Sequence, residues 1–155
     1  MTAPRIAFTV EQVSHLSASA EQVWRNASTM EGVNAELGPW LRMGVPSAAR
    51  GRSLAAVTPG REAFVSTLFL LGVVPFDRHH LTLEAVHAFG FDEESWSWLQ
   101  RRWRHERRIT PTPSGCTVTD RLTVVPRLAP ALLVRPVVAA VFAWRHRRLR
   151  AQFAA

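Results

Sequence analysis

Two alternating segments joined by a short turn-forming loop most constrain how this chain can fold. In residues 99–110 the even positions are all polar, whereas the odd positions include Leu99, Trp103 and Ile109. In residues 116–126 apolar side chains again tend to recur at every second position. Because successive side chains of a strand point to opposite faces, each segment is a predicted strand with one inward face. The intervening Pro-Thr-Pro-Ser-Gly predicts an antiparallel hairpin.

The inner faces of these strands predict a charged pair inside the protein. With a loop at residues 111–114, His105 lies opposite Asp120 and Trp103 opposite Leu122, so that apolar side chains match along the inner face. An opposite charge within about 4–6 Å favours imidazolium and carboxylate together. Two interpretations stay open: Asp120 only neutralises an inward basic side chain, or the pair serves a ligand in an apolar pocket.

The rest of the chain predicts two short helices, further strands and one long helix. Ser19 and Gln22 match a capping box, and residues 28–31 repeat the pattern, so two short tandem helices end at Gly38. Strands are expected at residues 6–16, 40–45, 64–71 and 79–89, with a short one after a turn at 90–94, and the long helix at about 129–153. This order predicts an α+β fold in which the concave face of a curved antiparallel sheet receives the long helix.

All 19 residues counted as Lys or Arg are arginines, and they gather toward the end of the sequence. Residues 1–100 contain 7 Arg and 10 acidic residues, whereas residues 101–155 contain 12 Arg and 2 acidic residues. This asymmetry favours an anionic partner such as a nucleic acid, a membrane surface or an acidic ligand. A solvated arginine-rich surface is the competing explanation.

Several classes of site are not expected. The single Cys116 excludes an internal disulfide framework and a cysteine-based zinc finger. His79 and His87 share a predicted strand face but lie about 26 Å apart, so no metal site is expected. The sequence contains no phosphate-binding loop or hydrolase motif, and no cofactor is expected. The arginines of 101–108 alternate between faces, which argues against specific nucleic-acid binding. The apolar runs are shorter than the roughly 20 residues of a membrane span, and we expect a soluble, cytoplasmic protein.

Four short motifs follow one another over nearly the whole chain. They are Ser17–Trp24; Phe91–Glu94 followed by Trp103–Arg107; Asp120–Leu122; and Phe142–Leu149. Together they resemble the START-like (SRPBCC) superfamily, also called helix-grip or Bet v 1-like, and within it the bacterial polyketide-cyclase and ligand-binding branch. One departure is Ser95–Trp98, where many relatives have Gly-Pro before the hairpin.

The resemblance implies one START-like domain over residues 1–155, with a seven-stranded sheet around the long helix and a deep cavity between them. Members of the superfamily bind lipids, sterols, polyketides or other apolar molecules. Some are aromatases or cyclases, and others are interaction domains. The fold by itself does not choose among these functions.

The first hypothesis is therefore a protein that binds or carries a small hydrophobic or amphiphilic molecule, such as a lipid or polyketide. The expected lining is Leu83, His87, Phe89, Trp103, His105, Asp120, Leu122, Val138, Phe142 and Arg145, with Arg101, Arg107 or His105 holding an acidic or oxygenated end. One alternative is a cyclase or aromatase in which His105, polarised by Asp120, is the general base. Another is a module that contacts an anionic membrane surface through the arginine-rich end of the last helix. The oligomeric state stays open.

Overall fold

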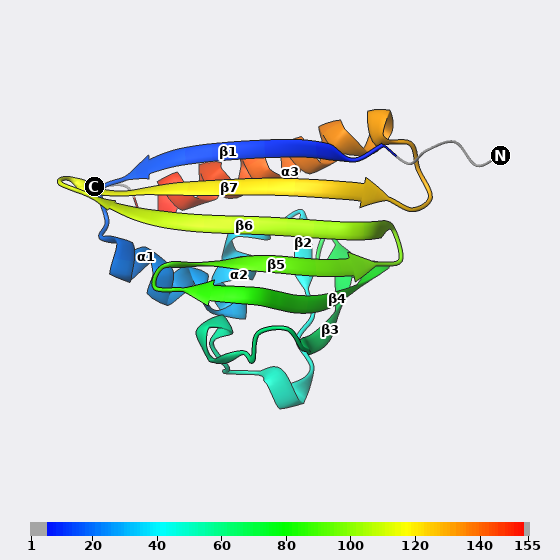
Figure 1. Ribbon diagram of the computed structural model, residues 1–155, viewed down its shortest axis with the longest axis horizontal. Coiled ribbons are helices and arrows are strands. Elements are labelled where there is room, and N and C mark those ends of the chain that lie inside the picture. Colours follow the sequence, from blue (N-terminus) through cyan, green and yellow to red (C-terminus); the bar gives the residue numbers. More distant parts are fainter. Residues whose placement is uncertain (1–5, 154–155) are drawn as a thin grey trace.

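The alternating segments form one antiparallel sheet of seven strands that curves around the long C-terminal helix (Figure 1). The computed structural model describes residues 6–153. The strands are β1 (Phe8–Leu16), β2 (Leu41–Met43), β3 (Glu62–Leu70), β4 (Val74–His87), β5 (Gly90–Ser97), β6 (Gln100–Thr112) and β7 (Gly115–Pro126). Their order across the sheet is β1-β7-β6-β5-β4-β3-β2. The predicted α+β class and helix-grip architecture are confirmed.

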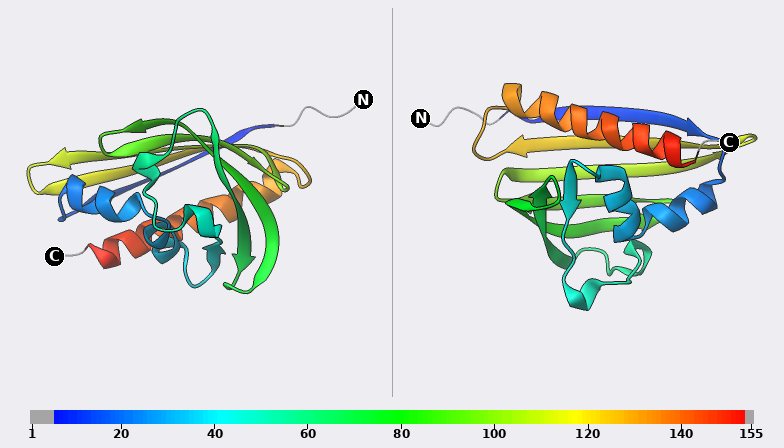
Figure 2. Two further views of the ribbon diagram at one scale, coloured as in Figure 1. Left: turned by 90° about the horizontal axis from the view of Figure 1, so that it is seen from below. Right: turned by 180° about the vertical axis from the view of Figure 1, so that it is seen from behind.

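The helices lie on the concave side of this sheet (Figure 2). They are α1 (Ala20–Ala27), α2 (Met30–Leu37) and α3 (Ala131–Gln152), and two short 3₁₀ turns, η1 (Ser47–Ala49) and η2 (Leu54–Ala56), lie between β2 and β3. The Ser19 hydroxyl accepts a hydrogen bond from the backbone of Gln22, as its capping pattern predicts. Thr29 caps α2 in the same way, by accepting from Gly32. Within residues 6–153, no helix has both the length and the apolar character that a membrane crossing requires.

The predicted register of the β6–β7 hairpin is wrong by two residues. Thr112 pairs with Gly115, so the turn is only two residues long, and both strands extend further than their apolar alternation indicates. As a result His105 lies opposite Leu122, and Arg107 lies opposite Asp120. A shift of two residues keeps every side chain on its predicted face, because the strand period is two. From Trp103 onward the predicted faces of β6 were therefore right while the partners were not.

The predicted inward orientation of His87 is also wrong. The pairing of β4 with β5 shifts between Leu83 and Ala85, which marks a β-bulge. An extra residue reverses the faces beyond it, so Val86 packs against the core and His87 is exposed. The Nε2 atom of His87 instead lies 3.1 Å from the Asp92 carboxylate.

Two groups of buried apolar side chains join the helices to the sheet. The first packs α1 and α2 on the sheet and includes Val23, Leu83 and Val118. The second packs α3 on β1 and β7 and includes Leu122 and Phe142. Each such fully buried side chain stabilises the fold by about 1.5–3 kcal/mol.

The end of the β6–β7 hairpin packs tightly against β1, and this generates a first prediction. Gly115 has a φ of +154°, and a Cβ added there would lie 2.0 Å from the carbonyl oxygen of Leu16. We expect Gly115→Ala to lower the free energy of unfolding by about 3 kcal/mol or more, because backbone atoms must move apart. Urea denaturation measures this loss.

Gly51→Ala is the matched control for that substitution. Gly51 also has a positive φ, +76°, but nothing lies within 4 Å of its added Cβ. Its loss of stability should stay near the 1–2 kcal/mol of backbone strain alone, about the penalty of a left-handed conformation. Equal losses in the two variants would show that the contact with Leu16 does not constrain the hairpin.

Candidate functional site

A cavity of about 120 Å³ lies between the two apolar groups of the core. Its wall combines α2, β2 and α3 with the inner faces of β3–β6 and with Leu54 of η2. Most lining side chains are apolar, among them Leu83, Phe91, Trp103 and Phe142. The polar ones are His79, Glu93, His105 and Arg145. The site is thus an apolar hollow with a group of titratable side chains on its wall.

The arginine that β6 buries behind this wall is occupied by carboxylates. Arg107 is 1% exposed and lies between Asp120 and Glu36, both fully buried. Its Nε and Nη2 donate to the two oxygens of Asp120 at 2.8 Å each. Its Nη1 and Nη2 donate to Glu36 at 2.9 and 2.7 Å. Four of the five guanidinium N–H groups therefore donate to protein carboxylates.

Arg145 approaches the same carboxylate from helix α3. Its Nε and Nη2 both lie 3.1 Å from Glu36 Oε1, and its guanidinium carbon lies 4.9 Å from the centre of the Phe142 ring. Glu36 thus connects α2 to β6 through Arg107 and to α3 through Arg145. This carboxylate ties three walls of the cavity together.

The histidines extend this network along the wall. The Nε2 atom of His105 donates to Asp120 Oδ1 at 2.6 Å, since an ionised carboxylate only accepts. The Nδ1 atom of His105 lies 3.7 Å from Glu93 Oε1. The other oxygen of Glu93 accepts from His79 Nε2 at 2.5 Å. Both nitrogens of His105 therefore face carboxylates.

Behind the wall, a second chain of contacts reaches the surface. His146 Nε2 donates to Asp120 Oδ2 at 2.7 Å, and its Nδ1 lies 2.7 Å from the Ser14 hydroxyl. The same hydroxyl oxygen accepts from Arg150 Nη1 at 2.9 Å. The Ser14 hydroxyl thus links His146 to Arg150 at the surface.

Ion pairing decides the charge of each buried carboxyl group. Burial raises the pKa of Asp120, but Arg107 and His105 outweigh it and hold that pKa well below the usual value. Burial likewise raises the pKa of Glu36, and Arg107 and Arg145 bring it below normal. For Glu93, burial is outweighed by His79 and His105, so its pKa is lowered too. All three groups are therefore carboxylates at neutral pH.

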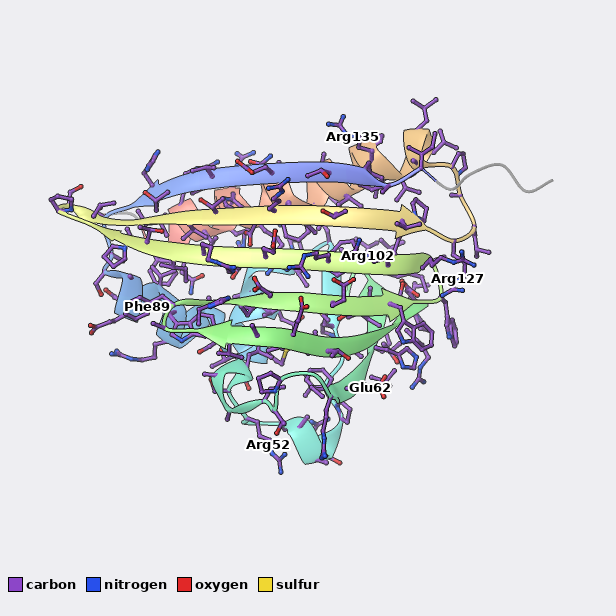
Figure 3. The ribbon with its side chains drawn as sticks, viewed as in Figure 1. Arg52, Glu62, Phe89, Arg102, Arg127 and Arg135 are labelled. Atoms are coloured by element: carbon purple, nitrogen blue, oxygen red, sulfur yellow. The ribbon has the colours of Figure 1, made fainter. Side chains whose placement is uncertain are left out.

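The structure brings together only part of the predicted lining. The cavity wall contains Leu83, Trp103, His105, Phe142 and Arg145. Arg107, Asp120, Leu122 and Val138 are buried next to it without lining it. His87 and Arg101 are exposed, Arg101 because the β6–β7 pairing shifts between Gln100 and Arg102. Phe89 packs on the first apolar group from the β4–β5 turn, at the opposite end of the sheet from Arg127 (Figure 3).

Sequence reasoning missed His79, Glu93 and Glu36 as parts of the site. Glu36 carried a signal, because it lies on the apolar side of α2 with Val33 and Leu37, where an unpaired carboxylate is costly. Glu93 carried a similar one, since it shares a strand face with Phe91. Neither signal indicates which side chain pairs with the buried carboxylate, because that pairing depends on tertiary contacts.

The buried network generates a prediction about stability and pH. Asp120→Asn leaves Arg107 with one carboxylate, so we expect the free energy of unfolding at pH 7 to fall by about 3–5 kcal/mol. The ordinary pKa of Asp is about 3.9, and the folded one is lower, so ionisation stabilises the protein above about pH 4. That contribution disappears as the pH falls through the folded pKa. Urea titrations between pH 3 and pH 7 measure both effects.

Asp92→Asn is the matched control for this experiment. Asp92 also has a lowered pKa: burial raises it, and the hydrogen bonds from Arg108 and His87 outweigh burial. However, its partners Arg108 and His87 lie at the surface, and surface pairs contribute about 0–1 kcal/mol. If Asp120→Asn proved no more damaging than Asp92→Asn, the buried network would not be a source of stability.

Comparison with solved structures identifies the fold. A START superfamily protein from Mycobacterium smegmatis matches with a TM-score of 0.66 at 12% identity, over 94% of this chain and 96% of that one. The Zhui aromatase/cyclase from Streptomyces sp. R1128 matches with a TM-score of 0.57 at 14% identity, over 96% and 98%. A protein from Chromobacterium violaceum matches with a TM-score of 0.68 at 11% identity, over 95% and 98%. At these identities the likeness shows the fold alone.

Comparison of the sequence itself gives a family. A search of curated proteins finds no match to it. Residues 14–153 match the model of a family described as a domain of unknown function, DUF8410. The chain thus belongs to the DUF8410 family, and its fold is the START-like, helix-grip fold that its sequence motifs resemble.

Proposed function

We propose that this protein binds a compact, largely apolar molecule that carries a neutral hydrogen-bonding group such as a hydroxyl. The observation that carries the proposal is the cavity between α3 and the sheet, whose apolar wall includes a group of polar side chains. Small-molecule sites commonly combine an apolar wall with a few placed polar groups. The START superfamily protein and the aromatase/cyclase among the structural neighbours support the same class of function.

The volume of the cavity limits the size of the ligand. Ligand pockets usually measure about 300–1,000 Å³, whereas an apolar cavity of about 150 Å³ accommodates benzene. At about 120 Å³, this cavity suits a ligand whose apolar part is about the size of a single ring. A fused-ring polyketide or a long acyl chain requires the side chains that close it, such as Trp103 and Phe142, to move apart.

The charges around the cavity favour a neutral ligand over an acid. Glu36, Glu93 and Asp120 are ionised, and Arg107 and Arg145 supply two positive charges. With the histidines left aside, these five groups carry one net negative charge. An anionic ligand adds a further negative charge at low dielectric, which is unfavourable. Arg101 and Arg107, which the sequence suggested as anchors for an acidic group, lie outside the wall.

Binding fits this geometry better than general-base catalysis by His105. A general base needs a ring nitrogen within hydrogen-bonding reach of the substrate proton. In His105, Nε2 donates to Asp120, and Nδ1 faces Glu93 at 3.7 Å. Catalysis therefore requires Glu93 to move away first, whereas binding requires no such movement.

A cavity-filling substitution tests whether this cavity is the binding site. Val141 lines the cavity from α3, so Val141→Phe places a ring in the space we assign to the ligand. We expect the affinity for benzyl alcohol, measured by NMR titration, to fall at least about tenfold. Val137→Phe is the control, because Val137 lies one turn earlier on the same helix and is 63% exposed. Unchanged binding to Val141→Phe contradicts the assignment of the ligand to this cavity.

A pair of probes tests the charge preference. Benzyl alcohol and benzoate have nearly the same size, but only benzoate is an anion at pH 7.5. We expect benzoate to bind at least about tenfold more weakly, because its charge is added to a buried site that already holds three carboxylates. Competition between the two probes in the NMR titration gives the ratio directly. Tighter binding of benzoate refutes the neutral-ligand proposal.

A further inference from the structure

Three connections and the start of α3 lie toward the same end of the sheet, where the β3–β4 turn projects beyond the other two. Leu70 pairs with Val74 and Gln100 pairs with Pro126, so the β3–β4 turn, the β5–β6 turn and the β7–α3 loop share that end. The backbone nitrogen of Leu99 donates to Asp77, and its carbonyl oxygen accepts from Arg127. In Figure 1 the β5–β6 turn and the β7–α3 loop lie together at the right-hand end.

This end exposes large apolar side chains from each of these segments. The apolar end, as we call it, consists of Leu71, Val73, Trp98, Leu128, Leu132 and Leu133, all more than half exposed. Val73 and Leu128 are each 74% exposed, and Leu132 is 86% exposed. Single exposed apolar residues are ordinary, but Trp98, Leu128, Leu132 and Leu133 come from adjoining segments, and such a concentration is typical of an interaction surface.

The first half of α3 shows that this surface has no partner within the described residues. Val134 and Val138 pack inward against the second apolar group of the core. On the other side, Leu132, Leu133 and Val137 face solvent, and Arg135 is the only charged residue from 131 to 138. A helix that is apolar on all sides is normally covered on all sides.

The charges around the apolar end have one sign. Its segments, residues 68–78, 96–102 and 126–137, contain five arginines and one acidic residue, Asp77. Asp77 is only 4% exposed and accepts hydrogen bonds from the backbone. Of the arginines, Arg102 is paired with Glu94. Arg127 and Arg135 both lie at the end where α3 begins (Figure 3).

We propose that the apolar end docks on the surface of a lipid bilayer containing anionic lipids. Apolar side chains with a tryptophan enter the boundary between headgroups and acyl chains, and arginines attract the anionic headgroups. The charges argue against a second copy of this chain, because a two-fold symmetric contact brings the same arginines together. Of the exposed arginines at the other end of α3, Arg148 donates to Ala35 and Arg150 to Ser14, so two of the three are occupied.

Flotation with vesicles tests this proposal on the full chain. We expect binding to phosphatidylcholine vesicles that contain about a third phosphatidylglycerol, an anionic lipid, and much weaker binding to phosphatidylcholine alone. High salt should weaken the binding to the anionic vesicles. The double variant Leu132→Ser with Leu133→Ser should bind at least about tenfold more weakly. Arg135→Gln should weaken binding about fivefold. Circular dichroism checks that the variants, all changed at exposed positions, remain folded.

Two controls locate the contact. Val13→Ser changes an exposed apolar residue of β1 outside the apolar end, and Arg147→Gln changes an exposed arginine at the far end of α3. Both should bind like the unchanged protein. The proposal is overturned if anionic vesicles are not bound, or if Arg147→Gln abolishes binding while the Leu132/Leu133 variant retains it. It is also overturned if sedimentation shows a dimer that this double variant dissociates, since a second copy then covers the apolar end.

Discussion

The buried guanidinium of Arg107 is the interaction on which the rest of the structure depends. It enters the core from β6 and holds Asp120 of β7 and Glu36 of α2 at 2.7–2.9 Å. A charge in such a place is tolerated only when it is fully paired, because the desolvation penalty is several kcal/mol per ion. The burial of Arg107 therefore requires α2 to lie where Glu36 can reach it. Through Arg145, the same requirement extends to α3.

This requirement also shapes the chemistry of the cavity. Arg107 is buried behind the wall and occupied by protein carboxylates, so the cavity does not present a free cation from β6. His79, Glu93 and His105 remain on the wall, and the two histidines share the carboxylate of Glu93. A wall of this kind offers hydrogen bonds more readily than charge. Under the proposed function, the network that holds the helices on the sheet also limits which ligands the cavity suits.

The arginine excess of the chain has three different physical roles. Arg107 and Arg145 are structural, as described. On the outer face of the sheet, Arg104 contacts Glu84, Glu94 and Glu106, which raise its pKa, so this positive charge is neutralised locally. Arg78, Arg101 and Arg135 are exposed in segments whose one acidic residue is buried, and they give one end of the molecule its positive character. A single count of net charge conceals this division.

The sequence by itself determined the features that depend on local periodicity. Alternation predicted the strands and the inward faces of the hairpin, and the capping pattern before Gln22 predicted the start of α1. It could not determine the partners across the sheet, because a shift of two residues leaves every face unchanged. It also could not place His87 or Arg101, because one extra residue in a strand reverses the faces beyond it. The pairing of Glu36 with Arg107, 71 residues away, and with Arg145, 109 residues away, was decided only by the tertiary structure. Such contacts arise when separate elements pack together, and no local pattern specifies them.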